Sequence, residues 1–344
     1  MALNPTSAFP VTDASHVAGP RRTVLRLAEH LGFSEARAGA AGLVATELAT
    51  NLAKHAKDGE ILLRVLHSPA GDPGGIQIVA VDRGPGMRNP NQSRSDGYST
   101  SGSLGYGLGA VERQSDVVDF FTDAKGTVFV ASIWREAPDP RAGCGSRYDV
   151  GAVHVAKPGE DVCGDAWCSR SRDGRLAILV ADGLGHGLLA HEAAEAAVDV
   201  FKKSHELPPA RVIEDIHAAL RATRGAAVAM LAVDTERGTA TYSGLGNITS
   251  SIIVSSTVAH HLVAHNGTAG HTAARIQEFH YPAPAGSVIA LWSDGLRNNW
   301  SLDAYPGLRA RSASVIAAIL YRDFSRRRDD VTLVVATDRP AAAG

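Results

Sequence analysis

Four acidic motifs spread over the second half of the chain constrain its fold more than any other feature. They are Gly164-Asp165, Asp182-Gly183, Asp294-Gly295 and Asp329-Asp330. Three of them begin or end apolar, strand-like runs, so a pair of sheets can gather their carboxylates at one edge. Two divalent ions about 3.5–4 Å apart at that edge would share a water molecule, lower its pKa and present it to a phosphate. Carboxylate and water ligands favour Mg²⁺ or Mn²⁺.

A single Asp-Gly pair is typical of a turn. Four acidic motifs in this order, each within a recognisable stretch of sequence, are not explained by turns alone. These stretches, which include VADGLGHG and WSDGL, resemble the PPM-type protein phosphatases, in particular their SpoIIE-like and RsbX-like bacterial branch. The resemblance implies that Asp165, Asp182, Asp294 and Asp329 bind metal, with Gly183 adding its backbone carbonyl. Asp165 and Asp182 would be central to catalysis. Many SpoIIE-like sequences carry a second acid three residues after the first, where this chain has Cys168, which puts any third metal in doubt.

The first half of the chain contains a long helical pattern with a polar face. Apolar periodicity predicts helices over 15–31 and 34–56, with Gly32 ending the first and Ser34 capping the second. Glu47, Asn51 and His55 are four residues apart and therefore share one helix face. A carboxylate and an amide one turn apart suit Mg²⁺, which commonly bridges substrate phosphates. Taken alone, the same spacing also fits the solvated face of an amphipathic helix.

Two glycine motifs follow this helix. The apolar run 76–81 leads into Asp82-Arg83-Gly84-Pro85-Gly86. This motif places a hydrogen-bond acceptor, the Asp82 carboxylate, beside glycines whose backbone can approach a ligand closely. The Gly/Pro/Ser-rich stretch Arg83–Leu104 is typical of a long loop. After it, Gly105-Tyr106-Gly107-Leu108-Gly109 opens a helix whose free N–H groups can cradle phosphate.

The ordered set of these three motifs resembles the ATP-binding fold of the GHKL family, shared by histidine kinases, gyrase-type ATPases and anti-sigma-factor kinases. The closest resemblance is to the RsbT-like serine kinases. It implies that Glu47 is a general base, that Asn51 holds Mg²⁺ and that Asp82 binds the adenine amino group of ATP. The glycines that would shape the nucleotide pocket and its lid are Gly84, Gly86, Gly105, Gly107 and Gly109. No phospho-accepting histidine segment is evident, which disfavours a sensor histidine kinase.

The organisation of the chain follows from its length and its breaks. A chain of 344 residues predicts two domains, and the segment Arg135–Ser146, rich in Pro and Gly, is typical of a linker. We expect a GHKL α/β sandwich at 13–136 and a PPM-type α/β/β/α sandwich at 147–338, with residues 1–12 as a loose leader. In the second half, expected strands are 149–156, 176–181, 226–234, 239–243, 249–254, 287–293 and 331–336, and expected helices are 188–204, 209–223 and 310–322.

Composition excludes several classes of function. The formal net charge of −2 gives no general reason to expect nucleic-acid or membrane binding. Three cysteines are too few for a disulfide framework and fit a reducing cytosol. The first ten residues lack the pattern of a signal peptide, and no apolar run reaches 18 residues. We therefore expect a cytoplasmic protein.

Several weaker features keep two interpretations. His186 can contact phosphate or only pack its Gly-His-Gly turn, and His260 and His261 fit ordinary strand positions. Cys163 and Cys168 are expected to be buried strand residues, with a redox or zinc-binding role as the alternative. The cluster Arg326–Arg328 can attract an acidic or phosphorylated partner or be a solvated charge run.

Together the two resemblances imply a bifunctional regulator of bacterial partner switching. One half would use ATP to phosphorylate a serine or threonine, and the other would hydrolyse phosphoserine or phosphothreonine. The implied partners are STAS-domain anti-sigma-factor antagonists or stressosome scaffold proteins. The alternative is that only the phosphatase half is an enzyme, and that the GHKL half is an ATP-binding or partner-binding switch module.

Overall fold

The computed structural model divides into two compact units, Met1–Gly143 and Cys144–Gly344, which are considered separately. It describes residues 6–67, 72–87, 107–136, 148–172, 174–204 and 207–338. None of the helices in this described part combines the length and the apolar character needed to cross a membrane.

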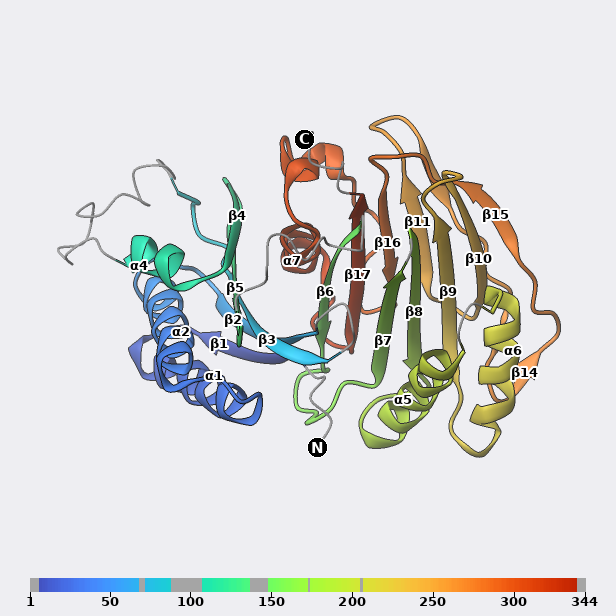
Figure 1. Cartoon of the computed structure of the whole chain (residues 1–344), viewed down its shortest axis with the longest axis horizontal. Helices are drawn as coiled ribbons and strands as arrows, with labels where there is room; N and C mark the ends of the chain where they lie inside the picture. The colour runs from blue at the N-terminus through green and yellow to red at the C-terminus, as the bar shows by residue number, and fades with distance from the viewer. Residues whose placement is uncertain are drawn as a thin grey trace. The chain divides into compact units, whose positions relative to one another are not determined.

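The first unit is a single antiparallel sheet with helices on one face (Figure 1). Over the described residues its strand order is β1-β2-β3-β5-β4. The strands are β1 (Ser7–Val11), β2 (Gly59–His67), β3 (Pro73–Val81), β4 (Val117–Asp123) and β5 (Gly126–Trp134). The helices are the 3₁₀ turn η1 (Ala14–Val17), α1 (Ala18–His30), α2 (Glu35–His55) and α4 (Gly107–Gln114). Alternate strand residues such as Ile61, Ile78 and Ala131 pack against the helices in one core, as expected for a two-layer sandwich.

The junction between α1 and α2 forms as the sequence predicts. Gly32 adopts a left-handed φ of 71°. Its N–H donates to the Glu29 carbonyl, and the N–H of Phe33 donates to the Ala28 carbonyl at 2.9 Å, the bonding pattern that closes many helix ends. The Ser34 side chain then accepts the Arg37 N–H at 3.3 Å and begins α2.

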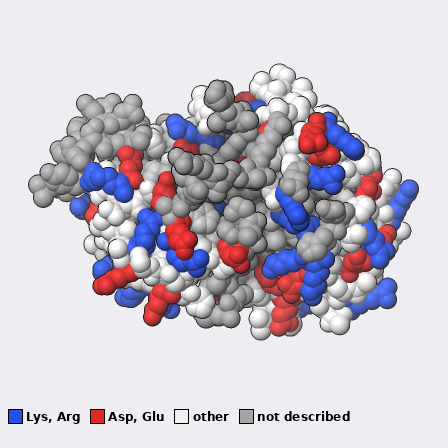
Figure 2. All heavy atoms as spheres, in the orientation of Figure 1, with Lys and Arg blue, Asp and Glu red and all other residues white. Residues whose placement is uncertain are grey.

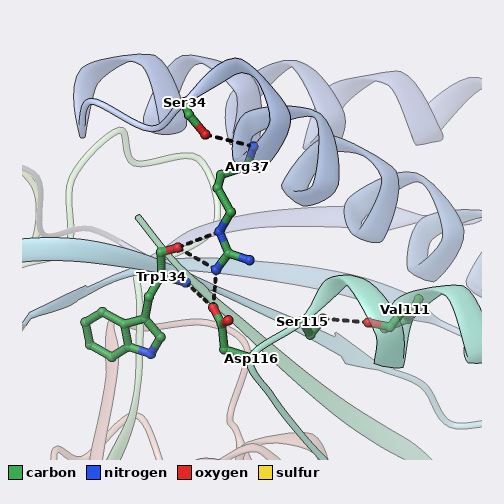
Figure 3. Close-up of polar contacts among 6 residues, drawn as sticks. All are labelled: Ser34, Arg37, Val111, Ser115, Asp116 and Trp134. Carbon is green, nitrogen blue, oxygen red and sulfur yellow. Dashed lines mark hydrogen bonds and ion pairs between the residues drawn. The ribbon is translucent and has the colours of Figure 1, made fainter. Parts of the chain in front are cut away.

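Arg37 also ties the start of α2 to the far end of the sheet (Figure 3). Its Nε and Nη2 donate to the Trp134 carbonyl at 3.0 and 2.6 Å, and Nη2 forms an ion pair with Asp116. Asp116 in turn accepts the Trp134 N–H at 2.7 Å. These four bonds fix α2, the α4–β4 turn and the end of β5 to one another.

The expectation of a loose leader is wrong for Ser7–Val11. This segment forms β1, with Pro10 opposite Glu60 and Val11 opposite Gly59 of β2. Proline is disfavoured inside a sheet because it cannot donate a ladder hydrogen bond, but it is tolerated in an edge strand. Val11 is buried in the core, so burial of one apolar residue outweighs the proline signal that suggested a leader.

The second unit contains two five-stranded sheets within its described residues, ordered β15-β10-β9-β8-β7 and β12-β11-β16-β17-β6. The strands are β6 (Tyr148–Val155), β7 (Asp165–Arg172), β8 (Arg175–Gly183), β9 (Ala226–Asp234), β10 (Thr239–Leu245), β11 (Thr249–Ile253), β12 (Ala259–His261), β13 (Gly267–Thr268), β14 (Thr272–Ala273), β15 (Phe279–Pro282), β16 (Val288–Trp292) and β17 (Val331–Asp338). The helices are α5 (Leu188–Lys203), α6 (Pro209–Ala219) and α7 (Ala313–Phe324), with 3₁₀ turns η2 (Leu220–Ala222), η3 (Leu302–Ala304) and η4 (Leu308–Ala310).

The cores of this unit define its layers. One core lies between the two sheets and includes Val180, Leu231 and Val334. A second core joins the first sheet to α5 and α6 through residues such as Phe201 and Ile216, and α7 packs on β6 and β17 of the other sheet. The predicted α/β/β/α sandwich is therefore confirmed, and each strand and helix range expected in this half overlaps an element of the structure.

Strand β7 has no counterpart among the predicted strands. Its sequence, DAWCSRSR, is too polar to stand out as an apolar run, and it lies at the edge of the described sheet, paired with β8. Cys168 lies within it and is partly exposed, whereas Cys163 is buried but precedes the strand. The expectation that both cysteines are buried strand residues is therefore wrong about the burial of Cys168 and about the strand position of Cys163.

Candidate functional sites

In the first unit, α2 and α4 bring together residues that are sixty positions apart. A Cβ built on Gly107, the first residue of α4, would lie 2.9 Å from Glu47 Oε2 and 3.9 Å from the side-chain amide atoms of Asn51. The start of α4, whose first N–H groups have no partner within the helix, therefore lies beside the Glu47 and Asn51 face of α2. A larger residue at position 107 would require the Glu47 carboxylate to shift.

Asp82 lies one residue after β3, beside the carboxyl end of α2. Its Oδ1 accepts the Gly84 N–H at 2.6 Å, and its own N–H donates to the Thr127 carbonyl at 2.9 Å. The Arg83 N–H donates to the Lys57 carbonyl at 2.8 Å, which ties this turn to the end of α2. The sequence predicted this proximity of a carboxylate and a closely approaching backbone.

The remaining glycines of the nucleotide motif have different surroundings. Gly86 has a φ of 72°, and a Cβ there would lie 2.1 Å from the Asp123 carbonyl oxygen, so only glycine fits. Gly109 is buried inside α4. Gly105 and most of the expected loop Arg83–Leu104 lie outside the described residues.

In the second unit, Asp165 and Asp182 are direct partners in the ladder between β7 and β8. Asp165 is only 1% exposed, and its Oδ2 accepts a hydrogen bond from Ser293 Oγ at 2.7 Å. Burial is the main cause that raises the pKa of Asp165 to about 7. Burial, followed by the charges of Asp165 and Asp294, raises the pKa of Asp182 to about 9.

Asp294 and Asp329 belong to the same electrostatic neighbourhood. Asp294 follows β16, and burial and the negative charge of Asp329 raise its pKa, whereas the charge of Arg326 lowers it. The Asn247 amide donates to Asp294 Oδ2 at 3.0 Å. Asp329 precedes β17 and also contributes to the raised pKa of Asp182. Four aspartates from distant segments therefore lie close enough to repel one another.

The donor set of this cluster fits divalent cations. Like charges brought together without a cation raise one another's pKa, and carboxylate oxygens are the ligands that Mg²⁺ and Mn²⁺ prefer. A Cβ on Gly183 would lie 2.1 Å from the Ala190 carbonyl oxygen, so glycine is required where α5 packs against this edge. Across the described residues, no three acidic, histidine or cysteine side chains already enclose a single ion position.

Several residues of this edge were not predicted. Ser293 donates to Asp165 and accepts the Thr332 N–H at 2.9 Å; its place directly before Asp294 was the available signal. Asp330 is buried, accepts the Lys157 N–H at 2.9 Å, and raises the pKa of Asp165. No sequence signal marked Asn247.

His186, for which two roles were open, lies 2.6 Å from Glu160, measured from Nδ1 to Oε1. A Cβ on Gly187 would lie 2.8 Å from Glu160 Oε2. The pair therefore packs the Gly-His-Gly turn, and contact of His186 with phosphate stays a prediction. His260 and His261 lie in β12, as expected.

Two family models match the chain. The model described as histidine kinase-like ATPase domain matches residues 9–133, and the model described as stage II sporulation protein E, SpoIIE, matches residues 172–338. A solved structure described as the bacterial stressosome, a modular system adapted to control secondary messenger signalling, is 29% identical with a TM-score of 0.52. That match covers 56% of this chain and all of the other.

Two curated relatives come from Bacillus subtilis (strain 168). The phosphoserine phosphatase RsbX is 34% identical over 92 residues, which cover 27% of this chain and 46% of RsbX. The chain therefore spans less than half the length of that relative. The serine/threonine-protein kinase RsbT is 30% identical over 135 residues, which cover 38% of this chain and 98% of RsbT. The chain thus belongs to the RsbT-like family of histidine kinase-like ATPases, and its second unit matches the SpoIIE family model over residues 172–338.

Proposed function

We propose that the second unit hydrolyses phosphoserine or phosphothreonine on protein partners with two Mg²⁺ or Mn²⁺ ions. The observation that carries the proposal is the cluster of Asp165, Asp182, Asp294 and Asp329, in which Asp165 and Asp182 are direct ladder partners and burial and neighbouring negative charges raise the pKa of Asp182 and Asp294. These carboxylates and the Gly183 carbonyl would hold the ions. Bound ions would supply an activated water and neutralise phosphate charge. The chain itself holds Asp165 in place through the Ser293 hydroxyl.

Asp182→Asn tests this role. It should lower hydrolysis of p-nitrophenyl phosphate and of a phosphoserine peptide with Mn²⁺ by roughly 10²–10³-fold, the size lost when one preorganised electrostatic group is removed. Asp199→Asn, on the exposed side of α5, is the matched control and should keep activity. Full turnover by Asp182→Asn, or after complete chelation of divalent ions, would rule out the two-metal site.

The first unit is proposed to bind ATP with Mg²⁺. Asp82 would accept the adenine amino group, Asn51 would hold Mg²⁺, and Gly84, Gly86, Gly105, Gly107 and Gly109 would shape the pocket. Support comes from the start of α4 lying beside Glu47 and Asn51 and from the ATPase-domain match. Asp82→Asn should weaken ATP binding about 10–100-fold, because a charged hydrogen-bond acceptor is replaced by an amide. Isothermal titration calorimetry measures this, and unchanged affinity would contradict the assignment.

We further propose that Glu47 acts as general base for phosphorylation of a serine or threonine. Its position one turn before Asn51 would bring it beside the γ-phosphate if Asn51 holds Mg²⁺. In a chain already carrying Asp182→Asn, so that product is not erased, Glu47→Gln should keep ATP affinity and lose phosphotransfer by roughly 10²–10⁴-fold. If the Asp182→Asn chain binds a STAS-domain partner but never phosphorylates it, the switch-module alternative replaces the kinase.

The proposed partners are STAS-domain anti-sigma-factor antagonists or stressosome scaffold proteins, which the likeness to RsbT and RsbX supports. The proposed location is the cytoplasm, where ATP is supplied and thiols stay reduced, and Cys163 and Cys168 are both free. The limits 13–136 and 147–338 remain predictions, with β1 now included in the sheet of the first unit.

A further inference from the structure

The loop between α7 and β17 carries Arg326, Arg327 and Arg328, all exposed. Backbone bonds pin this loop to the Asp294-Gly295 turn. The Arg326 N–H donates to the Gly295 carbonyl at 2.8 Å, and the Arg297 N–H donates to the Phe324 carbonyl at 3.0 Å. The arginines are therefore held beside the acidic cluster rather than on a free surface segment.

The turn at Arg327 has a specific shape. Arg327 has a φ of 54°, a left-handed conformation that is unfavourable for a residue with a side chain. Its N–H donates to Ser325 Oγ at 3.1 Å, which holds the turn. A charge run that only keeps the surface solvated needs no such fixed backbone.

The charges of this loop act at the rim of the site. Burial and the charge of Asp329 raise the pKa of Asp294, and the positive charge of Arg326 opposes that rise. On the face drawn in Figure 2, basic and acidic side chains are interspersed over the described residues, so no broad basic field dominates that face. Three consecutive arginines beside the reacting centre are therefore a local feature that can select a nearby anionic group.

A second exposed group, near the Asp182-Gly183 turn, favours a protein as the substrate. Leu184, Leu188 and Leu189 follow Asp182-Gly183 and are 47%, 61% and 49% exposed. Clustered exposed leucines are typical of protein contact surfaces. A small phosphate ester would need neither these leucines nor a basic rim.

We propose that Arg327 and Arg328 dock acidic residues that flank the phosphorylated serine or threonine of a protein substrate. This inference rests on the proposed phosphatase function and adds a substrate preference to it. Arg326 is left unchanged in the tests because its charge acts on Asp294, one of the proposed metal ligands. The docking residues lower the KM for acidic substrates and take no part in phosphate cleavage.

The test compares two phosphoserine peptides, one with glutamates and one with glutamines on both sides of the phosphoserine. With the full-length chain and Mn²⁺, the acidic peptide should have a KM about tenfold lower, and the difference should shrink in high salt. The double variant Arg327→Gln/Arg328→Gln should abolish the preference while changing hydrolysis of p-nitrophenyl phosphate less than twofold.

Arg237→Gln is the matched control. Arg237 lies in the turn after β9, and the β8–β9 register places that turn at the opposite end of the strands from Asp182. This variant should keep the preference for the acidic peptide. Loss of the preference in Arg237→Gln, its survival in the double variant, or an equal fall in p-nitrophenyl phosphate hydrolysis would each overturn the docking role.

A binding measurement separates this inference from the phosphatase proposal. Fluorescence anisotropy of the labelled acidic peptide with the full-length Asp182→Asn chain requires no turnover. Tighter binding of the acidic peptide that depends on Arg327 and Arg328 would support docking even if no hydrolysis were found. Equal binding of both peptides would overturn it.

Discussion

Each unit places an aspartate at the end of a strand with a glycine one or two residues later, yet the two aspartates have opposite surroundings. Asp82 of the first unit accepts the Gly84 N–H at 2.6 Å. Asp182 of the second unit is surrounded by Asp165, Asp294 and Asp329, and its pKa is raised to about 9. A carboxylate held by backbone donors can recognise a neutral amine, whereas a crowded carboxylate requires cations.

Similar Asp/Gly motifs therefore differ in chemistry because the fold places different groups beside them. The glycines of the first unit bring backbone N–H groups, which suit an anionic phosphate. The strand ends of the second unit bring more carboxylates, which suit divalent ions. The proposed nucleotide site and the proposed metal site therefore differ less in their motifs than in the charge of the neighbouring groups.

Among changes that leave every proposed catalytic and ligand residue in place, the largest expected effect comes from removing the hydrogen bond that supports one carboxylate. Ser293→Ala deletes the hydroxyl that donates to Asp165 Oδ2 at 2.7 Å. Loss of such support for a metal ligand typically costs about 10–100-fold in metal affinity or activity, and Mn²⁺ titration with p-nitrophenyl phosphate measures both. ATP binding by the first unit should not change, which sharpens the contrast between the two sites.

Ser287→Ala is the control for that prediction. Ser287 is equally buried and donates to the Pro284 carbonyl at 2.7 Å, at the opposite end of β16 from Ser293. It should lower stability without lowering Mn²⁺ affinity. If both serine variants lose Mn²⁺ affinity alike, Ser293 has only a general structural role.

The sequence predicted the strands and helices that have strong periodic patterns, but not those held by tertiary pairing. β8 and β9 are continuous apolar runs and were found to within a few residues. β7 is polar, and it forms because its backbone pairs with β8 and places Asp165 opposite Asp182. β1 contains a proline and forms because Val11 can be buried at an edge.

In the candidate metal site, the sequence likewise predicted the aspartates but not the residues that contact them. Asp165, Asp182, Asp294 and Asp329 each sit in a local motif, and the fold brings them together. Ser293 lies within one of these motifs, but its partner is 128 positions away. Asn247 has no motif of its own and reaches Asp294 across 47 positions. The folded chain is therefore needed to show what these two residues contact.

The second prediction concerns pH and metal removal. Asp165 and Asp182 have folded pKa values of about 7 and 9 against an ordinary 3.8. Between pH 4 and 9 the unfolded metal-free chain therefore binds fewer protons than the folded chain, so stability falls as pH rises through this window. Below about pH 4 this stabilisation is fully present. Thermal unfolding of the metal-free second unit should follow this trend.

Divalent ions should reverse that loss. At a Mn²⁺ concentration a hundredfold above its Kd, binding adds about 2.7 kcal/mol, and for a domain of this size each kcal/mol raises Tm by about 2–4 °C. The gain should be larger at pH 8 than at pH 5, because the ligands must ionise to bind metal. Asp182→Asn should flatten the pH trend; an unchanged trend would show that other groups cause it.

The smallest expected effect tests whether the two units are energetically separate. Arg37→Ala removes the guanidinium that bonds Asp116 and the Trp134 carbonyl (Figure 3). Because the arginine side chain is 28% exposed, water can replace part of these bonds, and the free energy of unfolding of the first unit should fall by about 1–2 kcal/mol.

Arg37→Lys keeps the charge but not the forked geometry and should recover only part of that loss. Urea unfolding followed together with p-nitrophenyl phosphate hydrolysis should show a destabilised first unit and unchanged phosphatase activity. A parallel loss of p-nitrophenyl phosphate hydrolysis would mean that the proposed phosphatase activity requires an intact first unit.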